Sequence, residues 1–333
     1  MDYKLLSYQT AQGVQAGLLV EGHVFALAEL TGRAEDSTVL EVLTDWPSRQ
    51  GRLDQAAQRA ALAPSSGQPL DKVILAAPVL YPSAIYCAGA NYRDHAREMA
   101  QAAGRPEGPD PRAGGRAPWH FLKPSRTVVA NHQPVQLPRG SKTVDWEVEL
   151  AAVIGRLARD VSVDEALDYV AGYTVANDLS ARDLSRRAGT AESSPFYFDW
   201  LGHKVFDGSC PLGPWITPAH QLGDPQALKL GLTLNGVVKQ DSSTSEMIFT
   251  IAEQIAYLSS RRTLYPGDLV LTGTPAGVGA GRGEFLKAGD VIEAWVEGVG
   301  SLVTPITDSA PLGAKPIRRQ GAAQAPTANF VGI

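Results

Sequence analysis

The segment VDWEVELAAVIG, residues 144–155, constrains the fold more than any other part of this 333-residue chain. Side chains alternate along a strand, so Asp145, Glu147 and Glu149 share one face and the apolar residues between them share the other. The segment continues as an apolar run, which favours an inward acidic face over a solvated one. Three carboxylates on an inward face repel each other unless a cation or basic side chains compensate, and hard divalent cations prefer oxygen ligands.

Another carboxylate, Asp178, stands at the end of an apolar run in GYTVANDLSARD, residues 172–183. A carboxylate at such a place is commonly a turn former or the N-cap of the next segment. Asp178 alone is therefore not diagnostic of a site. Asp183 lies beside Arg182, and we predict an ion pair between these two residues.

A histidine and a glutamate lie three positions apart in NYRDHAREM, residues 91–99. On a helix, His95 and Glu98 share a face, and a carboxylate beside an imidazole fixes its tautomer and raises its basicity. That is what a general base needs, although an ordinary surface pair has the same spacing. No metal-ligand spacing connects the other histidines, which are predicted to be structural or surface residues: His23, His120, His132, His203 and His220.

Closely spaced glycines occur in TGTPAGVG, residues 272–279. Neither the GxGxxG pattern nor a Walker pattern is present, so a nucleotide site is poorly supported. Backbone N–H groups of this segment, or the hydroxyl of Thr274, could instead bind a carboxylate.

The first 72 residues differ in pattern from the rest. Residues 4–30 alternate between apolar and polar, with Gly22 at a turn, which predicts short antiparallel strands. Residues 38–62 have helical spacing broken by Pro47 and end in the turn-rich stretch APSSGQPLD. We therefore predict three parts of the chain: a small N-terminal domain (1–72), a catalytic domain (73–312) and a loose C-terminal tail (313–333).

The remainder of the chain is predicted to be mainly β. Asn235-Gly236 between two strand-like runs predicts a two-residue hairpin, because both turn positions need positive φ. Gly, Pro and Arg are frequent in residues 101–118, which predicts a mobile loop. The strand-like runs are 84–87, 144–154, 228–234, 269–272 and 291–296. The predicted helices are 91–102, 163–169 and 247–259.

Composition excludes several classes of protein. The net charge is −5 and basic residues are dispersed, so no nucleic-acid partner is expected. Two cysteines, Cys87 and Cys210, are too few for a disulfide framework. The N-terminus lacks a signal-peptide pattern, and no apolar run reaches the roughly 20 residues of a membrane span. A cytoplasmic protein without a membrane partner is expected.

Seven motifs, taken in order, resemble the fumarylacetoacetate hydrolase family. They extend over roughly residues 84–307: GANYRDHAREM, FLKPS, VDWEVELAAVIG, NDLSARD, K-x-FDGSCPLGPW, LNGVVKQ and LYPGDLVLTGTPAGVG. The resemblance implies a mainly β fold with some helices, a mixed β-sandwich roll of the fumarylacetoacetate hydrolase type with a small N-terminal β-rich domain. It also implies a homodimer.

The resemblance further implies a site. Mg²⁺ or Mn²⁺ is expected on Glu147, Glu149 and Asp178. The catalytic residues are expected to be His95, Glu98 and Lys204, with the His/Glu pair on a segment that becomes ordered over bound ligand. Substrate contacts are expected from Arg182, Ser185 and Thr274. Many relatives have glutamine where this chain has Ser185, so that side of the pocket is expected to be wider or differently hydrogen-bonded.

The implied chemistry is metal-dependent hydrolysis of a C–C bond in a β-diketo acid, such as an acylpyruvate or fumarylpyruvate, through a metal-stabilised enolate. Aromatic-compound catabolism is a fitting context. Oxaloacetate decarboxylation and isomerisation of a hydroxymuconate-type acid need the same enolate and stay open as alternatives. A non-catalytic binding member of the fold is a third interpretation.

Overall fold

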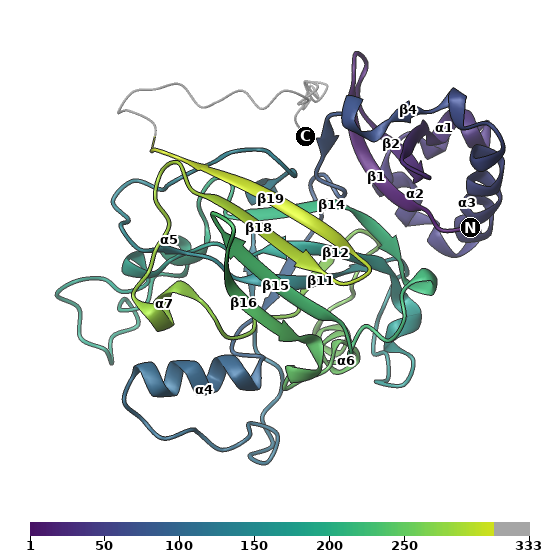
Figure 1. The fold of residues 1–333 in the computed structure, drawn as a ribbon. Helices are drawn as coiled ribbons and strands as arrows, with labels where there is room; N and C mark the ends of the chain where they lie inside the picture. Colours follow the sequence, from purple (N-terminus) through teal and green to yellow (C-terminus); the bar gives the residue numbers. More distant parts are fainter. Residues whose placement is uncertain (310–333) are drawn as a thin grey trace, which may run out of the picture.

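Two packed β-sheets form the centre of the molecule in the computed structural model, which describes residues 1–309 (Figure 1). The predicted loose tail, 313–333, lies outside the described residues. Within residues 1–309, no helix has the length and apolar character needed to cross a membrane. The mainly β fold predicted from the sequence is confirmed.

The larger sheet has the strand order β4-β3-β2-β1-β14-β12-β11-β17-β6-β7, with β5 paired to β1 and β8 paired to β14. Its strands are β1 (Lys4–Thr10), β2 (Gly13–Val20), β3 (His23–Ala26), β4 (Gln68–Pro69), β5 (Leu75–Ala76), β6 (Ile85–Ala88), β7 (His120–Lys123), β8 (Val128–Val129), β11 (Val148–Ile154), β12 (Val170–Asn177), β14 (Cys210–Pro218) and β17 (Leu269–Leu271).

The second sheet has the order β16-β15-β18-β19-β9 and covers one face of the first (Figure 1). Its strands are β9 (Val135–Gln136), β15 (Lys229–Leu234), β16 (Val237–Ser243), β18 (Val291–Val296) and β19 (Gly300–Thr307). The turn between β15 and β16 is Asn235-Gly236, with φ of 53° and 78°, so the predicted hairpin is confirmed. A two-stranded ladder pairs β10 (Val144–Asp145) with β13 (Ser180–Ala181).

Strand β11 is buried on both faces, which explains its continuous apolar sequence. Leu150 and Ala152 belong to the core between the two sheets. Ala151 and Val153 point the other way, into a core shared with Trp46 of the N-terminal unit. Glu149 lies on this second face because the side chains alternate.

The helices of the N-terminal unit contribute to that second core and lie beside β1 and β2 (Figure 1). They are α1 (Leu27–Thr31), α2 (Val39–Thr44) and α3 (Trp46–Leu62). Pro47 lies in the first turn of α3, where its missing N–H has no cost, so the predicted break at this proline is confirmed. Strand β1 pairs with β14, and the division of the chain at residue 72 stays a prediction.

The other helices are short. They are α4 (Arg93–Ala102), α5 (Trp200–Lys204), α6 (Ile251–Arg261) and α7 (Gly279–Arg282). Helix α6 begins later than predicted because Thr250 and Glu253 form a capping box at its start. The 3₁₀ helices are η1 (Ala34–Asp36), η2 (Pro64–Ser66), η3 (Leu70–Lys72), η4 (Ser125–Thr127), η5 (Ala166–Tyr169), η6 (Arg182–Leu184), η7 (Ala219–Gln221) and η8 (Thr244–Glu246).

Three predicted elements are corrected. The strands predicted over 4–30 end at Ala26, and the residues that follow form α1. The helix predicted over 163–169 is only the 3₁₀ turn η5. The strand predicted over 144–154 is interrupted after Asp145, because backbone N–H groups there donate to side-chain oxygens instead of to the backbone of a neighbouring strand. The Glu147 N–H donates to Asn177 Oδ1 at 2.9 Å, and the Val148 N–H donates to Gln240 Oε1 at 2.9 Å.

Candidate active site

The register of β11 on β12 brings the predicted metal ligands together. Val148 pairs with Asn177, so Glu147 and Asp178 face each other one step beyond the ladder, where the Asp178 N–H donates to Glu147 O at 2.9 Å. Glu147, Glu149 and Asp178 each offer a carboxylate oxygen, and these oxygens lie within 4.8 Å of one another. All three residues are buried.

Asp145 does not join this cluster, although the alternation of side chains predicts that it shares a face with Glu147 and Glu149. Its carboxylate instead accepts hydrogen bonds from the N–H groups of Gly279 and Ala280, at 2.6 and 3.0 Å. The interruption of the strand after Asp145 separates its carboxylate from those of Glu147 and Glu149.

Three cationic side chains compensate the carboxylates. The Lys204 ammonium donates to Glu147 Oε2 at 2.8 Å and to Asp178 Oδ2 at 2.6 Å. Lys123, at the end of β7, donates to the other oxygen of Asp178. Arg182 donates to Glu147 at 2.6 Å and to Asp145 at 2.9 Å. The ion pair predicted between Arg182 and Asp183 is wrong, because Asp183 accepts from Ser141 and the Lys142 N–H instead.

These contacts shift the pKa values of the carboxyl groups in opposite directions. Burial alone would raise the pKa of Glu147, but Lys204 and Arg182 outweigh it and hold that pKa well below its usual range. Burial, together with repulsion from Asp178 and Glu147, raises the pKa of Glu149 well above its usual range. Glu149 is therefore the carboxyl group with the least cationic compensation.

The charge balance tests whether a divalent cation fits this site. Within residues 1–309, the four buried carboxylates, including Asp145, are compensated by Lys123, Lys204 and Arg182, which leaves one uncompensated negative charge when all four are ionised, as they would be around a bound cation. A divalent ion would turn this into one positive charge, which a substrate carboxylate would neutralise. The oxygen donors are those that Mg²⁺ and Mn²⁺ prefer. The residues present therefore fit a divalent cation and an anionic ligand together.

The histidine and glutamate of the helical motif lie on α4. His95 Nδ1 is 3.4 Å from Glu98 Oε2, and the other oxygen of Glu98 accepts from the Gly277 N–H at 2.9 Å. Burial raises the pKa of Glu98, but the hydrogen bonds from His95 and Gly277 outweigh it and lower that pKa. A Cβ at Gly281 of α7 would lie 2.8 Å from Glu98 Cδ, so glycine permits this approach. The anionic Glu98 thus fixes the orientation of His95.

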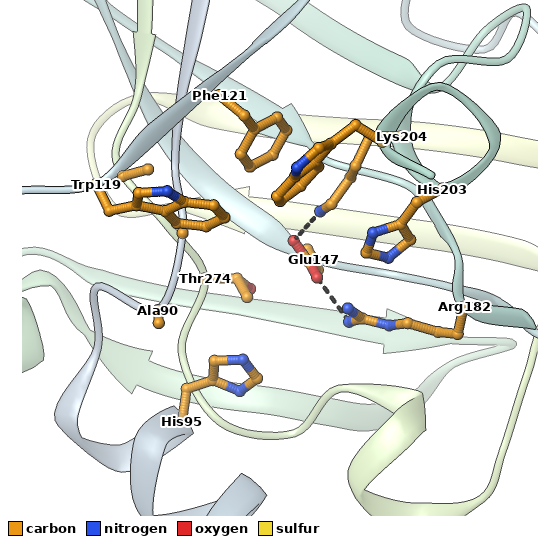
Figure 2. Close-up of a pocket in the computed structure, with 12 residues that line it drawn as sticks. Ala90, His95, Trp119, Phe121, Glu147, Arg182, His203, Lys204 and Thr274 are labelled. Carbon is orange, nitrogen blue, oxygen red and sulfur yellow. Dashed lines mark hydrogen bonds and ion pairs between the residues drawn. The ribbon is translucent and has the colours of Figure 1, made fainter. Parts of the chain in front are cut away.

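A cavity of about 200 Å³ is lined by Glu147 of the carboxylate cluster and by His95 of this pair, whereas Glu149, Asp178 and Glu98 are not among its lining residues. Figure 2 shows His95 on one side of it and Lys204 on the other, with Glu147 and Arg182 between them. At roughly 30 Å³ per water, the volume corresponds to about seven waters, which suits a small organic acid. The residues predicted from the sequence that line it are His95, Glu147, Lys204, Arg182 and Thr274.

Two predicted substrate contacts lie in different surroundings. Thr274 lines the cavity and its hydroxyl oxygen accepts from Gln240 Nε2 at 2.9 Å, which leaves its own proton available to a ligand. The Ser185 hydroxyl donates to Arg182 O at 2.6 Å, and Ser185 is not among the residues that line the cavity. The roles of these residues toward a substrate stay predictions.

Sequence reasoning missed several residues of the site, including the aromatic residues that line the cavity, Trp119, Phe121 and Trp200. Lys123 lies in the motif FLKPS, but no acidic partner is near it in sequence. Gln240 positions Thr274 from the distant strand β16. His203 was predicted to be a structural or surface residue; it is buried, so it is not at the surface, and it lines the cavity. Its position next to Lys204 of the K-x-FDG motif was the available signal.

The fold and the site together define a β-sandwich roll with a buried carboxylate cluster next to a histidine–glutamate pair. The family model described as Fumarylacetoacetate (FAA) hydrolase C-terminal matches residues 84–307. The chain therefore belongs to the fumarylacetoacetate hydrolase family, whose members are enzymes.

Relatives in this family carry different activities. The chain is 38% identical over 276 residues to the human mitochondrial oxaloacetate tautomerase FAHD2B, and this match covers 82% of each chain. The structure of maleylpyruvate hydrolase from Sphingobium sp. SYK-6, in complex with manganese(II) and pyruvate, is similar with a TM-score of 0.69 and 27% identity. That match covers 92% of this chain and all of the other.

A third relative is an isomerase. The structure of 5-carboxymethyl-2-hydroxymuconate delta-isomerase from Mycobacterium smegmatis matches with a TM-score of 0.68 and 31% identity, over 92% of this chain and 100% of the other. Tautomerase, hydrolase and isomerase thus occur on the same fold.

Proposed function

We propose that this protein hydrolyses a C–C bond in a small β-diketo acid of the acylpyruvate type, with Mg²⁺ or Mn²⁺ as cofactor. The observation that carries the proposal is the single cavity onto which His95, Glu147, Lys204, Arg182 and Thr274 all open. One face of that cavity carries charge for an anionic 2-oxo acid and the other carries a positioned base.

Glu147, Glu149 and Asp178 would hold the cation. A bound divalent ion supplies a Lewis acid that stabilises negative charge on a carbonyl oxygen. The manganese and pyruvate of the Sphingobium hydrolase structure support both the type of ion and the 2-oxo acid head.

Arg182 and Thr274 would bind the carboxylate of the substrate. A guanidinium has five N–H donors, and Arg182 uses Nε and Nη2 on Asp145 and Glu147. Within residues 1–309, Nη1 donates no hydrogen bond, so it is available to a ligand, as is the Thr274 hydroxyl. Both groups are held in place before the ligand arrives.

His95 would act as the general base. Glu98 faces Nδ1, which leaves Nε2 as the acceptor of a proton from water. The resulting hydroxide adds to the distal carbonyl carbon of the acylpyruvate, and the bond between that carbon and C3 then breaks. C3 takes a proton to complete pyruvate, and the acyl group leaves as a carboxylate. General-base catalysis typically contributes about 10²–10⁴-fold to the rate.

Lys204 would stabilise the oxyanion that forms on the distal carbonyl. An ammonium has three donors, and Lys204 uses two of them on Glu147 and Asp178. Its pKa is raised because the attraction of Asp178 and Glu147 outweighs burial, so the group stays charged. The third N–H is therefore a permanent donor for developing negative charge.

A second candidate is keto–enol tautomerisation of an oxaloacetate-like acid. The 38% identity to the human oxaloacetate tautomerase supports it. In this reaction His95 would move a proton at C3 without an attacking water. Decarboxylation of oxaloacetate and isomerisation of a hydroxymuconate-type acid use the same head group and are further alternatives.

A turnover screen distinguishes these candidates. Acylpyruvates, oxaloacetate and a hydroxymuconate-type acid are each supplied with Mg²⁺ and with Mn²⁺, and pyruvate release, tautomerisation and CO₂ release are followed separately. The proposal expects pyruvate release from acylpyruvates to be the fastest reaction. Absence of turnover with all substrates would favour a non-catalytic binding role.

Three wider properties are part of the proposal: a homodimer, a cytoplasmic location and a place in aromatic-compound catabolism. The isomerase relative, which acts on a carboxymethyl-hydroxymuconate, supports the last of these.

A further inference from the structure

One side of the cavity is aromatic. Trp119, Phe121 and Trp200, here called the aromatic wall, all line it. Trp119 and Phe121 are labelled in Figure 2. The Trp200 ring lies 5.1 Å from the Trp119 ring and 4.9 Å from the Phe121 ring, measured between centroids. These separations are typical of packed aromatic pairs, so the wall is one continuous surface. The reaction proposed above assigns it no role.

His203 continues the aromatic wall with a polar ring. It is one helical turn from Trp200 on α5, and its ring centroid lies 6.0 Å from that of Trp200 and 5.9 Å from that of Phe198. The residue is only 7% exposed and lines the cavity. A ligand that lies along the wall therefore meets an imidazole at its end.

Both ring nitrogens of His203 are buried, and neither has a hydrogen-bond partner among the described residues. Buried polar groups in folded proteins almost always have a partner, so such an exception needs an explanation. A ligand in the cavity that the ring lines would supply the missing partner.

The imidazole is neutral. Burial, and then the nearby cations Lys204 and Arg182, lower the pKa of His203 to about 3. A neutral imidazole offers one N–H donor and one nitrogen acceptor. It can thus bind a hydroxyl, which both donates and accepts, or donate to a carboxylate.

We propose that His203 determines which acyl group the site accepts, by hydrogen-bonding a polar substituent on a planar, unsaturated or aromatic acyl group that lies against the aromatic wall. The inference rests on the proposed function for the 2-oxo acid head. It adds a specificity-determining residue at the other end of the substrate. Short, saturated acyl groups would leave both the wall and His203 unused.

Binding, rather than turnover, tests this role. The full-length protein carrying His95→Ala, which the proposed mechanism makes slow, is loaded with Mn²⁺ and titrated calorimetrically. The ligands are 2,4-dioxo-4-phenylbutanoate and its counterparts with a 4-hydroxyl or a 4-carboxylate on the ring. Oxalate serves as a head-only ligand. We expect at least one substituted ligand to bind about 3- to 10-fold more tightly than the parent, the range of one hydrogen bond.

His203→Phe keeps a ring of similar shape and removes both nitrogens. It should reduce the preference for a polar substituent below about 2-fold while oxalate and the parent ligand bind as before. His203→Asn retains a donor and an acceptor and should keep part of the preference, which protects the test against poor folding of one variant. His23→Phe, in the N-terminal unit, is the matched control and should keep all of it.

The two hypotheses fail separately. A preference that persists in His203→Phe, or the absence of any preference with His203 intact, would overturn the role of His203. Suppose instead that Mn²⁺-dependent oxalate binding is lost while the preference for a polar ring substituent is intact. That result would reject the proposed function and support His203 as a ligand-binding residue.

Discussion

The two ends of the cavity are built differently. At the carboxylate end, Glu147 lies just before β11 and Glu149 is the second residue of this central strand, and hydrogen bonds hold both carboxylates. At the aromatic end, the rings come from short elements and loops, and Trp119 is 51% exposed. The nitrogens of His203 have no hydrogen-bond partner within residues 1–309. The two proposals divide in the same way: the reacting groups are assigned to a buried strand, and recognition of the acyl group is assigned to shorter and partly exposed elements.

The strongest test of the carboxylate end is Glu149→Gln. Loss of an outer partner of a metal ligand commonly weakens binding by 10–100-fold, so removing a ligand charge should weaken Mn²⁺ binding by more than about 100-fold and abolish turnover. Calorimetric titration with Mn²⁺ measures this. The exposed Glu293→Gln on β18 is the control, and unchanged affinity in Glu149→Gln would place the metal elsewhere.

The same variant should fold normally. The folded pKa of Glu149 is raised, so ionising this group lowers stability as the pH increases. Glutamine removes that effect, and the metal-free variant should melt at the same temperature as the parent protein or higher at pH 8. A markedly lower melting temperature would mean that Glu149 has a structural role.

His95→Ala tests the base that lies between the two ends. Acylpyruvate hydrolysis should fall by at least about 100-fold, because water loses its proton acceptor. Any oxaloacetate decarboxylation should fall less, since no water attacks and the carboxylate cluster is intact. Glu98→Ala should be milder, because the imidazole remains but loses its orientation. Parallel assays at saturating Mg²⁺, with His23→Ala as control, decide this; hydrolysis that survives nearly undiminished would remove His95 from the mechanism.

The neutral His203 predicts a pH effect on stability. The folded pKa is about 3 and the unfolded pKa about 6.5, so the unfolded chain binds the extra proton and stability falls as pH drops below 6.5. At pH 5 this amounts to up to about 2 kcal/mol. Denaturant unfolding at pH 8 and pH 5 should show a smaller loss in His203→Phe than in the parent or in His23→Phe. Equal losses in all three would mean that His203 is charged or solvated.

The loop over 101–118 should be more accessible to proteases without ligand, and Arg112→Ala should increase cleavage further. Arg112 forms an ion pair with Glu253 of α6, and exposed pairs contribute about 0.2–1 kcal/mol, so an effect of about two- to five-fold is expected. Limited proteolysis with and without oxalate measures both effects. Equal cleavage in both states would argue against a lid.

The smallest effect is expected from Gly89→Ala, which disturbs the aromatic wall alone. A Cβ at this position would lie 1.8 Å from Trp119 Cζ3, so the indole must move. The affinity for 2,4-dioxo-4-phenylbutanoate should fall about two- to five-fold, with oxalate unaffected. Gly51→Ala, where nothing lies within 4 Å of the added methyl, is the control. No change in affinity would mean that Trp119 does not contact the ligand.

Local sequence was sufficient where a pattern is short-ranged. Alternation placed Glu147 and Glu149 on one inward face, helical spacing placed His95 beside Glu98, and Asn235-Gly236 predicted its hairpin. Each inference depends on residues within a few positions of one another, where backbone geometry alone fixes the direction of a side chain.

Only the tertiary structure decided the partners that are distant in sequence. Lys123 donates to Asp178, 55 positions away in the sequence. Arg182 pairs with Asp145 and Glu147 rather than with its neighbour Asp183. His203 lines the cavity, and its ring nitrogens have no partner within residues 1–309. These outcomes depend on strand register and on which charges are buried together. The energy of a buried ion pair depends on its three-dimensional surroundings, which neighbouring residues in the sequence do not determine.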